Sequence, residues 1–239
     1  MLWTPKAPAL SPRPLVTPLP RKLPISLHPS CVLALLPQND DKWHDYSGRW
    51  NHGIAHGAKP TAKGPQGFAW EFDGVDDWIS TSMSGFPDPM TDITIAFRTS
   101  PSGLLLTNSL LTAVPDDTEN RICLHFPWGN NIIFWDFGNV NAGGRLTMPW
   151  NAAWNNVWAD WVLSSESGAG QKMYRDTVLL TWSNTWSSFS RGTKTLDIVR
   201  YGTTFWKGFI DHFRIYHQAW SPRPQDANYL PEIDPLLHG

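Results

Sequence analysis

The chain has 239 residues, of which 41% are hydrophobic and 17% charged, and its formal net charge is −2 at pH 7. This composition is typical of a globular protein, and the balanced charge argues against a nucleic acid partner. No apolar run approaches the roughly 20 residues that a membrane-spanning helix needs, so we expect no membrane insertion. The 15 tryptophans and 21 prolines favour strands and turns over helices.

Residues 1–30 are predicted to form an extended arm because prolines interrupt them throughout. Proline fixes its own φ and pushes the preceding residue into extended conformations, which excludes a helix or a central strand. We expect the apolar side chains of the arm to dock on a neighbouring subunit; they include Trp3, Leu10, Leu15, Val16, Leu19 and Ile25. Packing on its own domain, or disorder, is the alternative. The first residues also lack the basic start and apolar stretch of a signal peptide.

Residues 31–230 are predicted to form one all-β domain, and residues 231–239 a short tail. Runs of β-branched and aromatic residues alternate with Gly, Pro, Asn and Asp turn signals. The expected strands are 32–36, 68–72, 78–80, 91–99, 103–111, 121–126, 131–137, 145–148, 157–164, 171–175, 177–182, 195–199 and 205–216. So many short strands predict an antiparallel two-sheet sandwich.

Two details of this pattern are specific enough to check. In the last strand, simple alternation places Phe209, Asp211, Phe213 and Ile215 on one face. The tryptophans between 150 and 161 have helical spacing, but strand-forming residues follow them, so we expect a loop and then a strand, with a short helix at 152–156 as the alternative. The two cysteines, Cys31 and Cys123, are expected to be free buried thiols, with a disulfide as the alternative.

Four segments carry motifs in a consistent order: DYSGRWNHG at 45–53, GFAWEFDGVDDWI at 67–79, VWADWVL and then KMYRDT within 157–177, and WKGFIDHFRIY at 206–216. Together they resemble the laminin-G-like branch of the concanavalin A-like lectin and glucanase superfamily, over residues 32–229. The resemblance implies an antiparallel jelly-roll sandwich. Thr177 stands where the family has glycine, so the turn of that hairpin departs from the family pattern.

The resemblance also implies a candidate ion site. Members of the family often hold calcium at the rim of the sandwich through oxygen ligands. The matching positions are Asp45 and Asp211, so we expect either no cofactor or one structural calcium ion. The alternative is that these carboxylates only accept hydrogen bonds, as we expect for Asp73 in the turn at Asp73-Gly74. Arg49-Trp50, in place of small flexible residues, weakens the calcium interpretation.

No catalytic residue is predicted, although the superfamily includes glucanases. Its retaining members place Glu-x-Asp-x-Glu on one strand face, and glycoside hydrolysis needs two carboxylates at a set separation. The nearest approach to this pattern is Glu71 with Asp73, and Asp73 belongs to a turn. We therefore expect a protein that is not an enzyme.

Tryptophans near turns provide a binding hypothesis, because indole faces stack on sugar rings and on other aromatic groups. The candidates for glycan or partner binding are Trp128, Trp150, Trp154, Trp182 and Trp186. The alternative for each is packing in the core or under a loop.

Two functions fit these features. The first is a structural component of a large assembly, namely a phage virion protein of the decoration, head–tail or tail kind that docks on other subunits through its arm. Similar laminin-G-like domains occur in phage structural proteins, which permits this assignment and a virion location. The second is a carbohydrate-binding module or adhesin for surface glycans, with or without calcium.

Overall fold

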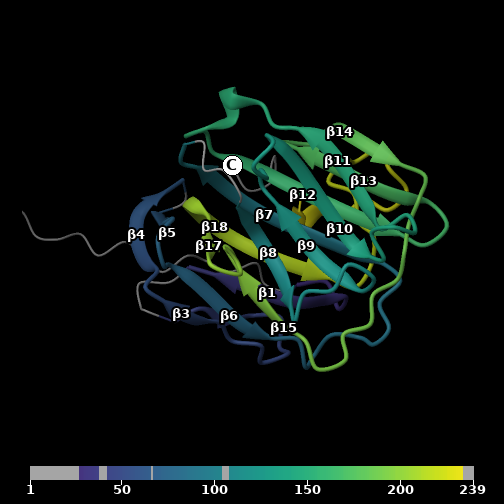
Figure 1. Ribbon diagram of the computed structural model, residues 1–239, viewed down its shortest axis with the longest axis horizontal. Coiled ribbons are helices and arrows are strands. Elements are labelled where there is room, and N and C mark those ends of the chain that lie inside the picture. Colours follow the sequence, from purple (N-terminus) through teal and green to yellow (C-terminus); the bar gives the residue numbers. More distant parts are fainter. Residues whose placement is uncertain (1–26, 38–41, 66, 104–107, 234–239) are drawn as a thin grey trace, which may run out of the picture.

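The computed structural model describes residues 27–37, 42–65, 67–103 and 108–233. Their strands form two large antiparallel sheets stacked face to face (Figure 1), which confirms the predicted two-sheet sandwich. Within these ranges there is no α-helix, only the short 3-10 helices η1 (Ala152–Trp154) and η2 (Pro231–Ile233). No helix of the described part is long and apolar enough to cross a membrane. The arm residues Trp3, Leu10, Leu15, Val16, Leu19 and Ile25 lie outside the described residues.

The larger sheet has nine strands in the order β14-β13-β12-β7-β18-β1-β2, with β5 also paired to β18 and β4 to β5. Its strands are β1 (Cys31–Leu36), β2 (His44–Asp45), β4 (Lys59–Gly64), β5 (Gly67–Asp73), β7 (Ile93–Pro101), β12 (Ala159–Glu166), β13 (Gly170–Arg175), β14 (Val178–Ser183) and β18 (Lys207–Tyr216). The first and last long strands, β1 and β18, therefore pair with each other in this sheet.

The second sheet has seven strands in the order β11-β10-β9-β8-β15-β6-β3. They are β3 (Ile54–His56), β6 (Trp78–Ser82), β8 (Ser109–Val114), β9 (Arg121–His125), β10 (Ile132–Gly138), β11 (Arg145–Pro149) and β15 (Thr195–Ile198). A small hairpin of β16 (Arg200–Tyr201) and β17 (Thr204–Phe205) follows β15 and packs against β8.

The core lies between the two sheets, where side chains of alternate strand positions interlock. Phe126, directly after β9, contacts rings from the opposite sheet edge-on. Its centroid lies 5.7 Å from that of Phe97 on β7 and 4.8 Å from that of Trp161 on β12. Much of the high aromatic content is thus used to join the sheets.

The predicted alternation along the last strand is wrong at its start. Between Ile210 and His212 the register of β18 against β7 shifts by a β-bulge. A bulge inserts one unpaired residue and so reverses which positions face inward. Ile210, Phe213 and Ile215 therefore enter the core, while Phe209 stays half-buried outside it.

Several short strands were not predicted from the sequence, and one strand was placed too early. The unpredicted strands include β2, β3, β4 and β16. In β3 and β4, residues with weak strand preference such as His, Lys, Pro and Gly hide the pattern. The strand expected at 103–111 is β8, at Ser109–Val114. The tryptophan-rich segment contains the 3-10 helix η1 and then β12. A short helix, the alternative to a loop, is therefore present, and the strand expected after it is confirmed.

The two faces of the sandwich are covered differently. On the outer face of the nine-stranded sheet, a second apolar cluster forms where Leu230 and Ile233 pack over Ala34, Val162 and Tyr216. The C-terminal segment therefore covers part of this sheet. The hollows described below lie on the outer face of the other sheet. Cys31 and Cys123 are both buried thiols outside any disulfide, as expected.

Candidate functional site

A hollow of about 290 Å³ opens on the outer face of the seven-stranded sheet, over β9, β10 and β11. Along β9, Ile122 and Leu124 point into the core. The alternate residues, Arg121, Cys123 and His125, therefore face outward. The lining comprises Thr118, Arg121, His125, Trp128, Phe134, Arg145 and Tyr201. Aromatic and cationic side chains thus converge from three strands, a loop and the β16–β17 hairpin.

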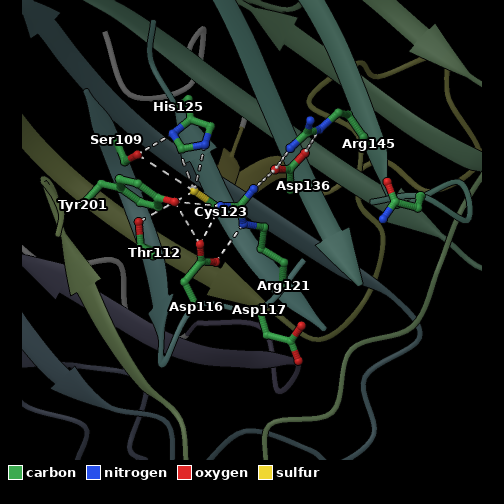
Figure 2. Close-up of polar contacts among 12 residues, drawn as sticks. Ser109, Thr112, Asp116, Asp117, Arg121, Cys123, His125, Asp136, Arg145 and Tyr201 are labelled. Atoms are coloured by element: carbon green, nitrogen blue, oxygen red, sulfur yellow. Dashed lines mark hydrogen bonds and ion pairs between the residues drawn. The ribbon is translucent and has the colours of Figure 1, made fainter. Parts of the chain in front are cut away.

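Asp136 lies at the centre of a charged network beneath this hollow (Figure 2). Its side chain is fully buried on β10. Arg145 donates two hydrogen bonds to its carboxylate, at 2.6 and 2.7 Å, and Arg121 donates one at 3.0 Å. Arg121 also donates to both oxygens of Asp116, at 2.7 and 2.5 Å. Such paired bonds fix the plane and position of each guanidinium group.

The charges in this network balance, because it holds two guanidinium and two carboxylate groups. Burial alone would raise the pKa of Asp116, but the hydrogen bonds and charge of Arg121 outweigh it and lower that pKa. The hydrogen bonds that Arg145 donates to the Asp136 carboxylate raise the pKa of Arg145. At Arg121, burial lowers the pKa, but its carboxylate partners Asp116 and Asp136 outweigh burial, and the pKa is raised. With two guanidinium groups facing two carboxylates, the network carries no formal net charge.

His125 forms part of the floor and is only 4% exposed. Ser109 Oγ lies 2.6 Å from its Nδ1, and Cys123 Sγ lies 3.6 Å from its Nε2. Burial, with the charges of Arg121 and Arg145, lowers the pKa of His125 to about 3. Burial raises the pKa of Cys123 to about 12, so the thiol is protonated and is not a nucleophile.

The walls of the hollow are aromatic. Trp128 lies 4.1 Å from His125 between ring centroids and stands perpendicular to Tyr201 at 5.4 Å. On the other side, the Arg145 guanidinium lies over the Phe134 ring at 4.9 Å. The Tyr201 hydroxyl donates to Asp116 at 3.0 Å, so this wall is tied to the charged network. The rings hold fixed positions around the opening, with Trp128 and Tyr201 partly exposed.

The predicted tryptophans lie in different places. Trp128 lines the hollow. Trp150 is buried between the sheets against Phe126, at 5.1 Å, so its prediction as a surface binding residue needs correction: it is a core residue. Trp154 is half-buried and packs edge-on against Trp150 at 5.3 Å. Trp182 and Trp186 are exposed, at 63% and 37%, but Trp182 lies on β14, the edge strand of the other sheet, and Trp186 lies in the loop after it.

Asp45, a predicted calcium ligand, uses its carboxylate to hold its own loop. Oδ1 accepts the backbone N–H groups of Ala34 and Ser47, both at 2.9 Å. Oδ2 accepts the Ser47 hydroxyl and the Asn51 N–H, both at 2.9 Å. A carboxylate offers about four lone-pair positions, so all of them are taken. The hydrogen-bonding alternative therefore describes Asp45.

Asp211, the other predicted ligand, is fully buried on β18. β1 lies between β18 and β2, so Asp211 and Asp45 are two strands apart and offset along them. Two strand spacings amount to about 10 Å, whereas two oxygens on one calcium ion lie within about 5 Å of each other. The structure does not bring the two predicted ligands together.

Asp73 takes the turn role expected of it, since its carboxylate accepts the Val75 N–H at 2.8 Å. Its carboxylate also lies near those of Asp76 and Asp77, within 4.8 Å. Asp77 in turn accepts the Asp73 N–H at 2.9 Å, so these groups serve the turn itself.

Of the residues that line the hollow, sequence reasoning found Trp128 and missed Arg121, His125, Phe134, Arg145 and Tyr201. A signal was present in β9, where Arg121, Cys123 and His125 alternate with two apolar residues. That pattern predicts a polar outward face. It could not show that β10 and the β16–β17 hairpin would supply the partners.

Comparison with known proteins supports the β-sandwich fold. No protein-family model matches the sequence, and no curated protein matches it. Among solved structures, it is similar to the binding domain of Paraclostridial Mosquitocidal Protein 1, with a TM-score of 0.65 and 14% identity over 88% of this chain and 52% of that one. It is also similar to the binding domain of botulinum neurotoxin serotype G, with a TM-score of 0.63 and 14% identity over 87% and 50%.

A third similar structure is domain 4 of AbnA, an extracellular arabinanase of Geobacillus stearothermophilus, in complex with arabinotriose. Its TM-score is 0.63 with 15% identity, over 87% of this chain and 98% of that domain. This chain thus spans about half of the toxin binding domains and nearly all of the arabinanase domain. At such identities the likeness shows a shared β-sandwich fold.

Proposed function

We propose that this chain is a non-catalytic glycan-binding domain and that it binds on the outer face of the seven-stranded sheet. The observation that carries the proposal is the hollow in which Trp128, Phe134 and Tyr201 surround a fixed arginine–aspartate network. Ring faces suit the apolar faces of sugars, and the charged groups suit their hydroxyls. Aromatic walls with a few placed polar groups are typical of ligand pockets.

The charge balance favours neutral glycans. Both arginines are neutralised by Asp116 and Asp136, and His125 is uncharged at neutral pH. A carboxylated or sulfated sugar would meet no unpaired cation among these lining groups. Charged hydrogen-bonding groups can still donate to, and accept from, neutral hydroxyls.

The same pairing argues for binding without catalysis. Glycoside hydrolysis needs a carboxylic acid that gives up a proton and a second carboxylate. Arg121 lowers the pKa of Asp116, and Asp136 is held by two arginines, so neither carboxyl group suits the role of general acid. Cys123 is buried and protonated.

The similar structures support this function over the virion role predicted alongside it. One of them is the binding domain of a mosquitocidal protein, and another is an arabinanase domain in complex with arabinotriose, a neutral sugar. The virion interpretation depends on the proline-rich arm, of which residues 1–26 lie outside the described part of the chain. Docking on other subunits remains a prediction that only the assembled particle can test.

The full chain should be tested on an array of neutral, uronic-acid-containing and sialylated oligosaccharides. We expect binding to neutral glycans and a loss of about tenfold in affinity for Trp128→Ala, since an aromatic contact contributes about 1 kcal/mol beyond its buried area. Trp182→Ala is the matched control, because it removes an exposed indole from the other sheet. The proposal fails if no glycan binds, or if Trp182→Ala weakens binding and Trp128→Ala does not.

A further inference from the structure

A second hollow, of about 500 Å³, opens on the same outer face, over β6, β15 and β3. Side chains of two kinds line it: apolar groups that include Ile54, Trp78 and Val114, and polar groups that include Ser80, Asp197 and Arg200. Ile54 is 65% exposed and Val114 36%, so apolar surface stands open to solvent here. The glycan-binding proposal does not use any of these residues.

An ion pair and ring stacking position the polar groups of this second hollow. Arg200 lies 3.7 Å from the Asp197 carboxylate, and its guanidinium lies 4.1 Å above the Trp78 ring. His56 stacks on Trp78 at 3.9 Å with an interplanar angle of 8°. His56 Nε2 in turn lies 3.0 Å from the Ser80 hydroxyl. The indole, the guanidinium and the imidazole therefore fix one another.

Charge is balanced in this hollow as well. Asp197 and Arg200 carry opposite charges, and they form the one acid–base pair among the lining residues given above. Both hollows therefore combine aromatic walls with a paired guanidinium and carboxylate. Because the chemistry repeats, one kind of ligand suits both places, namely a neutral sugar with apolar ring faces and many hydroxyls.

Neighbouring residues of one hairpin line the two hollows. On β16, Tyr201 lines the first hollow and Arg200 lines the second. β8 and β15 lie between β9 and β6, so the two hollows are about three strand spacings apart, roughly 14 Å. The hairpin packs on β8 within that interval. A single sugar ring cannot reach both hollows, whereas a chain of several sugars can.

We infer that the two hollows are subsites for one extended neutral oligosaccharide, which crosses the sheet from β9 to β6. This inference rests on the proposed glycan-binding function and specifies its ligand as a chain rather than a terminal sugar. Arg200 and Tyr201 contact the chain on either side of the hairpin. In the second hollow, Ile54 on β3 and Val114 on β8 cover the apolar faces of the sugars.

The test is the dependence of affinity on chain length, measured by calorimetry with the full chain. The probes are linear 1,5-arabino-oligosaccharides and cello-oligosaccharides of one to six units. For the series that binds, we expect the affinity to rise at least tenfold from two units to six. Ile54→Ala and Arg200→Ala should each remove most of that rise and leave the affinity for the two-unit sugar unchanged.

Matched variants separate the possible failures. Val75→Ala, which shortens another exposed aliphatic side chain outside both hollows, should change neither affinity. Trp128→Ala should weaken both short and long sugars, because it alters the first hollow. If no length of any sugar binds, the glycan-binding proposal itself is wrong. If sugars bind with one affinity at all lengths, or the rise survives both Ile54→Ala and Arg200→Ala, binding stands and the two-subsite inference is overturned.

Discussion

His125 is a titratable group kept uncharged inside an otherwise charged cluster. It lies beneath the first hollow with the two arginines beside it, and burial and their positive charges both disfavour its protonation. In the unfolded chain the same imidazole titrates near pH 6.5. Protonation of His125 therefore costs free energy in the folded state that it does not cost in the unfolded chain.

The pH dependence of stability should reveal this penalty. Between pH 6.5 and about 3, the unfolded chain binds a proton at His125 and the folded chain does not, so stability is lost as the pH falls. We expect His125→Gln to flatten the decline of the melting temperature between pH 6.5 and pH 4, as measured by circular dichroism. Equal slopes for the two proteins would show that His125 is protonated in the folded state.

Single residues also explain why the predicted sites were found only in part. The identity of Asp45 suggests an oxygen ligand, but its four lone-pair positions are taken by groups as distant as Ala34. Trp150 follows a strand near a turn, as an exposed residue would, yet it faces inward between the sheets. In both cases the deciding fact is a contact distant in sequence, which local pattern does not contain.

At the level of elements, the β13–β14 hairpin shows how this fold tolerates a locally unfavourable residue. Its turn holds Asp176 at φ 48° and Thr177 at φ 67°, both in the left-handed region. A two-residue hairpin turn needs this conformation, which glycine adopts freely and a β-branched residue does not. The pairing of β13 with both of its neighbours outweighs the cost.

Thr177→Gly should therefore stabilise the protein. The left-handed conformation costs a side-chain-bearing residue about 1–2 kcal/mol, part of which the extra freedom of glycine in the unfolded chain offsets. We expect a gain of about 1 kcal/mol in the free energy of unfolding in urea, or about 3 °C in melting temperature. Thr193→Gly is the control, since Thr193 is exposed and has no positive φ, and it should not stabilise. A loss of stability in Thr177→Gly would mean that the threonine side chain contributes more than its backbone costs.

The elements that sequence reasoning missed share a physical cause. β3 and β4 form at the edge of their sheets from residues with weak strand preference, so neighbouring strands rather than local propensity create them. The bulge in β18 is set by its pairing with β7. Strands rich in β-branched and aromatic residues, such as β1 and β7, were found because propensity and tertiary pairing agree there.

For the molecule as a whole, the fold could be predicted and the proposed binding face could not. Many short strands and the order of the motifs are properties of the chain, and they define the sandwich. The proposed binding face needs Arg121, Arg145 and Tyr201 to meet, and these come from β9, β11 and the hairpin after β15. Their meeting depends on the strand order of the seven-stranded sheet, which the sequence pattern does not specify.

Some tryptophans and phenylalanines are buried between the sheets, and others are exposed on the surface. Unfolding experiments can separate the contributions of the two groups to stability. Phe126 is fully buried and contacts Phe97 and Trp161 across the sandwich. Trp182 is 63% exposed on an edge strand.

We expect Phe126→Ala to lower the free energy of unfolding by about 3–5 kcal/mol, because a large cavity would open between the sheets. Trp182→Ala should change it by no more than about 0.5 kcal/mol. Urea denaturation measures both, and a loss in Trp182→Ala as large as that in Phe126→Ala would mean that the exposed indole is covered by another part of the chain or by a second subunit.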